Sequence, residues 1–146
     1  MGRVHKIGIS KKKGNQILEM TQVELVQGKG IVDDRYFKIN NQKECQITLI
    51  EIENINNYNK KSGANIPAIN FRRNIITKNI RLNELLKKEF YVGNVQLKAH
   101  DLCRPCKYLQ ESLSQNNIIK EFLQTGGLRC EILSSGKIFV DDIIKN

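Results

Sequence analysis

Short runs of apolar residues, partly alternating with polar ones, recur along most of the chain and are typical of β-strands. Residues 3–10 and 16–28 flank the turn signal Gly14-Asn15 and predict an N-terminal hairpin. The run 45–51 has too little polarity for an exposed strand, so we expect a strand that is buried on both faces. Residues 128–133 and 137–142 predict a second hairpin near the C-terminus.

The middle of the chain mixes strand and helix patterns. Residues 51–61 have helical periodicity, and Ser62-Gly63 predicts the end of that helix. We expect a strand over residues 69–77, a turn or one short helical segment over 82–90, and a long strand region over 90–103 that is broken by Gly93-Asn94.

Two further helices are expected later in the chain. Pro105 predicts the first residue of a helix that runs toward Leu113, because proline suits the first helical position. Residues 117–127 predict a second helix, which ends at Gly126-Gly127.

Strands at both ends with short helices inserted late predict one β-rich α+β domain over residues 1–146, a closed or half-closed β-barrel. A Rossmann fold is disfavoured, because no G-x-G-x-x-G follows a strand.

Composition narrows the setting of the protein. No window approaches the roughly 20 apolar residues of a membrane span, and residues 1–16 lack the apolar stretch of a signal peptide, so we expect a cytoplasmic protein without a membrane. A net charge of +9 ordinarily suggests nucleic acid or an anionic small ligand as a partner. However, the lysines are spread out and few aromatics accompany them, which argues against nucleic acid as a partner.

The pair Cys103 and Cys106, in "CRPC", is the most distinctive chemical feature. A redox pair, half of a zinc site, a ligand for a heavier metal and a buried structural thiol all remain open. Zinc would need further ligands from Cys45, Cys130, His5 or His100. If Pro105 begins a helix, Cys106 lies in its first turn, where free N–H groups and the helix dipole favour a thiolate, the form that binds soft metals.

Arginines near turns are candidate anion contacts. If residues 69–77 form a strand, Arg72 and Arg73 point to opposite faces, and the inward arginine needs an anionic partner; Asn74 adds an amide. Asp34 and Arg35 could form an internal ion pair, or Arg35 could bind an anion. Arg129 follows Gly126-Gly127, which is either a phosphate-facing turn or a helix stop.

His100 precedes the cysteine pair by three residues and is expected to be a surface ion partner. Neither a G-x-S-x-G elbow nor a phosphate-binding loop of the G-x-x-x-x-G-K-[ST] type occurs.

Six segments are informative in combination: "GKGIVDDRYF", "QITLIEIE", "FRRNIITKNIRLNELL", "FYVGNVQLKAHDLCRPCKYL", "GGLRCEIL" and "GKIFVDD". Read in this order, they resemble the MOSC domain, the molybdenum-cofactor sulfurase C-terminal domain family, in its small standalone form. The most specific part is R-R-N-I, followed about thirty residues later by C-x-x-C and then by G-G-L-R. The resemblance spans nearly the entire chain.

The resemblance implies a β-barrel that binds the molybdenum cofactor, a molybdopterin, with a cysteine on the metal and basic residues on its phosphate and pterin. The family's metal-ligating cysteine matches Cys106, with Cys103 accessory, and its basic strand matches Arg72, Arg73 and Asn74. Relatives include sulfurases with a pyridoxal-phosphate desulfurase domain and reductases of N-hydroxylated compounds. No lysine can be identified here as a pyridoxal-phosphate Schiff base.

Two positions depart from the family pattern. Where the family usually has glycine before an aspartate, this chain has Asp33 in the first loop and Asp141 near the C-terminus.

Together these features predict a cofactor-binding protein with Cys106 as metal ligand and catalytic residue, and with Arg72, Arg73, Asn74, Asp34, Arg35, Cys103 and Arg129 around the cofactor. It would either reduce N-hydroxylated substrates with electrons from a partner protein, or carry the cofactor or a sulfur to a partner enzyme. The alternatives are a metal-free thiol redox or sulfur-relay protein that uses Cys103 and Cys106, and a structural module without catalysis. The sequence does not decide whether the protein is an enzyme.

Overall fold

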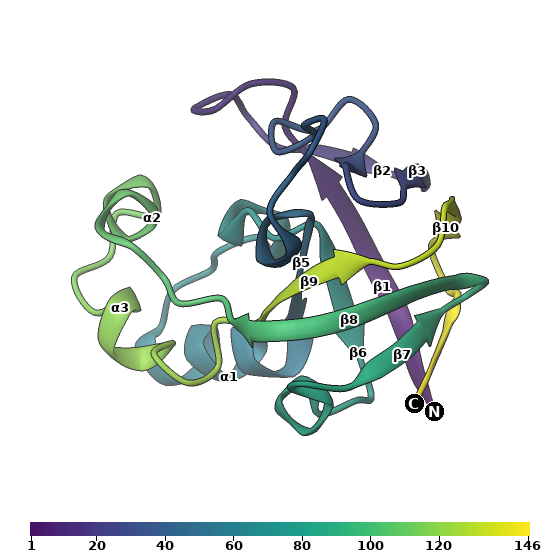
Figure 1. Cartoon of the computed structure of the whole chain (residues 1–146). Helices are drawn as coiled ribbons and strands as arrows, with labels where there is room; N and C mark the ends of the chain where they lie inside the picture. The colour runs from purple at the N-terminus through teal and green to yellow at the C-terminus, as the bar shows by residue number, and fades with distance from the viewer.

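The computed structural model describes residues 1–146 and contains a β-barrel with three short α-helices beside it (Figure 1). Seven strands form the ring, in the order β11-β7-β8-β9-β5-β6-β1, and pairing of β11 with β1 closes it. These strands are β1 (Gly2–Ile9), β5 (Ile47–Glu51), β6 (Ile75–Lys78), β7 (Glu89–Val92), β8 (Val95–Leu102), β9 (Leu128–Ile132) and β11 (Ile143–Lys145).

Strand β2 pairs with β1 and extends the barrel sheet. A second, small sheet has the order β10-β3-β4. These strands are β2 (Leu18–Met20), β3 (Gln22–Val26), β4 (Gly30–Ile31) and β10 (Gly136–Phe139). The N-terminal hairpin is confirmed for β1 and β2, but the rest of its second arm leaves the barrel as β3.

Three α-helices gather on one side of the barrel (Figure 1). They are α1 (Ile52–Ser62), α2 (Lys107–Ser112) and α3 (Ile118–Glu121), and the 3-10 turns are η1 (Lys43–Cys45), η2 (Ala68–Phe71) and η3 (Leu82–Leu85). Gly63 ends α1 in a left-handed conformation with φ 76°, as its sequence indicates. None of the helices has the length and the apolar character that a membrane span requires.

Strands β5 and β6 are parallel, and α1 connects them. Their side chains alternate between two apolar cores: Leu49 and Ile75 belong to the barrel interior, whereas Ile50 and Ile76 pack with the helices. The expectation that β5 is buried on both faces is therefore confirmed.

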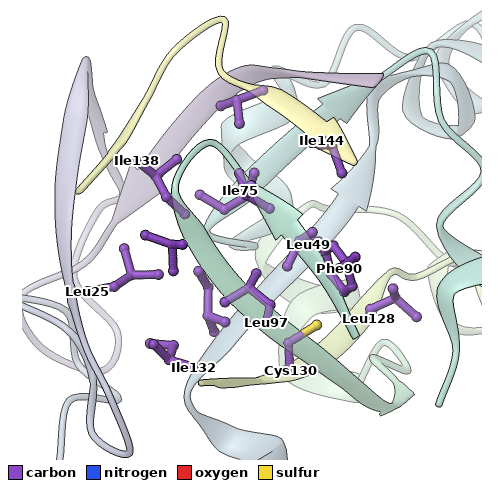
Figure 2. Close-up of a cluster of buried hydrophobic side chains, with 14 of the residues drawn as sticks. Leu25, Leu49, Ile75, Phe90, Leu97, Leu128, Cys130, Ile132, Ile138 and Ile144 are labelled. Atoms are coloured by element: carbon purple, nitrogen blue, oxygen red, sulfur yellow. The ribbon is translucent and has the colours of Figure 1, made fainter. Parts of the chain in front are cut away.

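The barrel interior is filled by mostly aliphatic side chains from nearly every strand, together with Phe90 and Cys130, so it is a packed core (Figure 2). The second core contains the aromatic rings of Tyr58, Phe71 and Phe122; the centroids of Phe71 and Phe122 are 5.0 Å apart. This second core holds α2 and α3 against the barrel.

Two strand predictions were wrong. Residues 128–142 do not form a hairpin, because β9 pairs with β5 and β8 while β10 pairs with β3. The strand expected over residues 69–77 begins only at Ile75, since Phe71 ends a 3-10 turn and Arg72 is left-handed with φ 64°. Arg72 and Arg73 therefore lie in the loop that leads into β6 rather than on a strand.

Two helix predictions were wrong in their bounds. Helix α2 begins at Lys107, and Cys106 is its N-cap with extended φ and ψ of −115° and 170°, so Pro105 is not the first helical residue and Cys106 is not in the first turn. Helix α3 ends at Glu121, well before Gly126-Gly127.

Candidate functional site

Loops at one end of the barrel surround a pocket of about 580 Å³. That volume lies within the range of about 300 to 1,000 Å³ that is usual for small-molecule sites. The walls come from the β1–β2 loop, the segment after β4, η1, β5, the loop before β6, the segment from the end of β8 into α2, and β9. The lining residues are Lys13, Gly14, Arg35, Tyr36, Glu44, Cys45, Thr48, Arg72, Arg73, Leu102, Cys103, Arg104, Cys106, Tyr108, Leu109 and Arg129. Six of the eight site residues expected from the sequence are among them.

The two cysteines of the "CRPC" segment both line this pocket but have different surroundings. Cys103 is half-buried and Cys106 is exposed, and neither forms a disulfide. Burial raises the pKa of the Cys103 thiol, while the charges of Arg73 and Arg129 act in the opposite direction. Cys106 is therefore the more accessible of the two thiols.

A third pocket thiol, Cys45, was missed as a site residue by sequence reasoning. It lies in η1, far from the "CRPC" segment in the chain, and the Nη2 group of Arg129 donates to its sulfur at 3.0 Å. No local motif marks Cys45, because the contact depends on β9 lying beside β5. The fourth cysteine, Cys130, is fully buried in the barrel core, and burial raises the pKa of its thiol.

Arg129 keeps part of its donor set free. Its Nε group donates to the carbonyl oxygen of Glu44 at 3.1 Å and its Nη2 group contacts Cys45. Since a guanidinium carries five N–H donors, the remaining ones are available to a ligand in the pocket.

Arg72 is held more loosely. Its Nη1 group donates to the carbonyl oxygen of Asn15 at 2.9 Å, and its guanidinium carbon is 5.7 Å from the centroid of the Tyr108 ring. Most of its donors are therefore unused in the protein.

Arg73 is buried, and its guanidinium donates to three backbone carbonyl oxygens: Gly126 at 2.9 Å, Cys103 at 3.0 Å and Phe71 at 3.4 Å. The sequence led us to expect an anionic partner for an inward arginine at this place. Three peptide dipoles provide the compensation instead.

Asp34 and Arg35 form the internal ion pair that the sequence left open, with 3.2 Å between Asp34 Oδ1 and Arg35 Nη1. The Asp34 carboxylate also accepts the backbone N–H groups of Ser10 and Tyr36, while Arg35 Nη2 donates to the carbonyl oxygen of Arg72 at 3.0 Å. Asp34 does not line the pocket; it shapes the loop that carries Arg35 and Tyr36 into the pocket wall.

Asn74 is also outside the lining. Its Oδ1 atom accepts the backbone N–H of Thr48 at 3.1 Å, and its Nδ2 group donates to the carbonyl oxygen of Gly8 at 3.1 Å. Asn74 therefore joins β1 and β5 beneath the pocket.

The pocket is strongly basic. Only Arg35 and Arg104 form ion pairs, with Asp34 and Asp101, whereas Arg72, Arg73 and Arg129 have no carboxylate oxygen within 4.0 Å. Lys13 adds a further positive charge, and Glu44 is the one acidic lining residue. Such an arrangement favours an anionic ligand.

His100 lies outside the pocket, and its Nε2 atom is 2.8 Å from Glu131 Oε1, consistent with an ion partner. No three His, Cys, Asp or Glu side chains gather in an arrangement that could hold a metal ion, so the four-ligand zinc site is not formed.

Comparisons with known proteins bear on the fold and the family. The MOSC domain family model matches residues 36–145. No curated protein sequence matches the chain significantly.

Several solved structures share the fold. The YuaD protein from Bacillus subtilis has a TM-score of 0.84 at 19% identity, with 99% of this chain and 94% of that chain covered. YiiM from Geobacillus stearothermophilus has a TM-score of 0.78 at 16% identity, with coverages of 99% and 74%. YiiM from Escherichia coli has a TM-score of 0.69 at 15% identity, with coverages of 98% and 68%. Because the family model spans most of the sequence, the chain belongs to the MOSC domain family.

Proposed function

We propose that this MOSC domain binds a molybdenum cofactor in the basic pocket, with the Cys106 sulfur as the protein ligand of the metal. The observation that carries the proposal is that an exposed thiol lines the same pocket as three arginines without carboxylate partners. The thiolate is a soft ligand, and guanidinium groups bind phosphate with matching geometry.

The lining residues fit such a group in size and in chemistry. The volume of about 580 Å³ is ample for a pterin that carries a phosphate. Tyr36 and Tyr108 are 40% and 51% exposed and offer aromatic surface to a planar ring. Arg72 and Arg129 retain free N–H donors for the phosphate, and Arg35 adds its charge from the pocket wall.

Bound molybdenum would supply the reduction of N–O bonds. The residues of this chain would bind and orient the cofactor: Cys106 would hold the metal, and Arg72 and Arg129 would neutralise the phosphate. Because the chain has no flavin or haem motif, electrons would come from a partner protein. Without such a partner, the same pocket would serve to carry the cofactor, or a sulfur on Cys106, to another enzyme.

Metal analysis tests the proposal. The protein is purified from a host that makes the cofactor, and molybdenum and pterin are measured per chain for the parent, Cys106→Ser and Cys103→Ser. We expect both in the parent, strong loss in Cys106→Ser and retention in Cys103→Ser. A parent without molybdenum and pterin contradicts the proposal, and equal loading of Cys106→Ser removes Cys106 from the site.

The phosphate contacts have their own test. Arg129→Gln removes charge and donors from the pocket, so we expect about tenfold weaker binding of the cofactor. Arg81→Gln is a matched control, because Arg81 is exposed and does not line the pocket. The affinity for the cofactor is measured in competition with inorganic phosphate. An unchanged affinity in Arg129→Gln would exclude a contact between Arg129 and the phosphate of the cofactor.

Turnover separates the enzyme from the carrier. The loaded protein is supplied with a reduced electron donor and an N-hydroxylated purine or amidoxime. Turnover supports a reductase, and its absence in fully loaded protein supports a carrier.

A second candidate is a metal-free thiol relay through Cys103 and Cys106. The observation that favours it is that three thiols, including Cys45, line one pocket. Recovery of a persulfide or disulfide on these cysteines in protein that lacks molybdenum would support the relay. A structural module would show neither.

A further inference from the structure

The buried guanidinium of Arg73 connects three separate segments of the chain. Its three acceptors belong to η2, to the β8–α2 loop and to the loop before β9, through the carbonyl oxygens of Phe71, Cys103 and Gly126. Arg73 is 9% exposed and has no carboxylate within 4.0 Å. Its donors therefore point at the protein backbone, in contrast to the largely unused donors of Arg72.

The β8–α2 loop and the loop before β9 approach each other unusually closely. The backbone N–H of Cys103 donates to the carbonyl oxygen of Gly127 at 2.7 Å. A Cβ atom on Gly126 would overlap the carbonyl oxygen of Cys103 and would lie 3.1 Å from Cδ of Pro105. Only glycine fits at position 126, so the start of the Cys103–Cys106 loop packs directly against the backbone of Gly126.

We propose that Arg73 is a positioning residue, which locks the Cys103–Cys106 loop onto Gly126 and thereby fixes where Cys106 stands in the pocket. Arg73 bridges the carbonyl groups of Cys103 and Gly126, and the Cys103 N–H bond to Gly127 closes the junction from the other side. The significance of this lock for metal binding rests on the proposed function, whereas the lock itself does not.

The electrostatics agree with this geometry. Among the charges near the Cys103 thiol, that of Arg73 is the strongest influence lowering its pKa against the effect of burial. The hydrogen bonds to backbone carbonyl groups thus hold a positive charge near the Cys103 thiol, and no carboxylate side chain is needed to compensate that charge.

The shape of arginine distinguishes a lock from an anion contact. A planar guanidinium reaches three carbonyl oxygens at once, whereas the compact ammonium of lysine keeps the charge but cannot span the same three acceptors. Arg73→Lys should therefore open the lock, although it would preserve much of a contact to a phosphate.

The experiment measures alkylation of each cysteine with iodoacetamide by mass spectrometry in the parent, Arg73→Lys, Arg73→Gln and the control Arg81→Gln. Loss of charged hydrogen bonds should expose the loop locally, so we expect about tenfold faster labelling of Cys103 in Arg73→Lys, which keeps a positive charge near the thiol. Arg73→Gln also removes that charge, and the resulting rise in the pKa of the Cys103 thiol opposes the faster labelling. Cys130 is buried in the barrel core and should stay unlabelled, which shows that the barrel is intact. If Arg73→Gln unfolds, so that Cys130 becomes labelled, the labelling of Cys103 in Arg73→Lys alone decides for or against the lock.

Parental labelling of Cys103 in Arg73→Lys would overturn the lock. Molybdenum content gives the readout of position: we expect Arg73→Lys to hold several-fold less metal than the parent although Cys106 is intact. Parental loading of Arg73→Lys would show that Arg73 does not position Cys106. A parent without molybdenum would defeat the proposed function, and the labelling of Cys103 would still decide for or against the lock.

Discussion

Two aspartates hold left-handed backbone conformations, with φ of 70° at Asp33 and 74° at Asp141. These are the positions at which the family resemblance leads us to expect glycine, which adopts such angles without steric cost. The loop geometry is therefore retained with aspartate in place of glycine, at a steric cost that glycine, which lacks a Cβ atom, does not have.

Substitutions at Asp33 should rank by their tolerance of positive φ. We expect Asp33→Gly to be at least as stable as the parent, whereas Asp33→Val loses about 1 to 2 kcal/mol, because a β-branched residue is poorly accommodated there. Urea unfolding at pH 7 measures this order. A Val variant as stable as the Gly variant would contradict it.

Glu51 gives a residue-scale pH dependence. Its Oε2 atom accepts the N–H of Leu82 at 3.0 Å, and burial is the largest cause that raises the pKa of its carboxyl group above the ordinary 4.5. Because the folded state then binds the proton more tightly than the unfolded state, Glu51 reduces stability as pH rises from about 4.5 through the raised folded pKa.

Glu51→Gln removes this titration and keeps an acceptor for Leu82. We expect its stability relative to the parent to be greater at pH 7 than at pH 4. Urea unfolding of both proteins across this range is the measurement, and a constant difference between them would show that Glu51 does not titrate differently on folding.

At the scale of the elements, local pattern was sufficient where one segment controls its own structure. The helical spacing of 51–61, its Gly63 stop, the buried strand β5 and the break at Gly93-Asn94 are all present. The local pattern failed where contacts between distant segments determine the structure: β10 pairs with β3, and Phe71 packs into the second core. No spacing within those segments records their partners.

Two glycines with positive φ should respond very differently to alanine. A Cβ on Gly127 would overlap the carbonyl oxygen of Leu49, whereas nothing lies within 4 Å of one on Gly63. We expect Gly63→Ala to cost about 1 kcal/mol, through backbone strain alone, and Gly127→Ala to cost clearly more, because β5 and β9 must separate. Thermal unfolding compares the two, and equal losses would refute the close packing at Gly127.

At the scale of the whole molecule, the site is assembled from segments between Lys13 and Arg129 that the strand order β8-β9-β5-β6-β1 brings together. Sequence reasoning named most of the basic residues because arginines beside turns and cysteines are visible locally. It could not place Cys45 beside Arg129, nor show that Arg73 faces carbonyl groups, since both follow from the packing of separate loops.

Closure itself depends on the short strand β11, which pairs with β1 and β7 and buries Ile144. Ile144→Ala should lower the free energy of unfolding by about 2 to 4 kcal/mol, as for other large core truncations. Leu123→Ala is the control, because Leu123 is 46% exposed. Equal effects of the two substitutions in urea unfolding would contradict a closed, packed barrel.

In the proposed function, the Cys106 sulfur binds molybdenum in this pocket. X-ray absorption at the molybdenum edge counts the sulfur neighbours of the metal in the loaded parent, in Cys103→Ser and in Cys106→Ser. We expect one sulfur neighbour fewer in whatever metal Cys106→Ser retains, and no change in Cys103→Ser. An unchanged sulfur count in metal bound to Cys106→Ser would contradict this expectation.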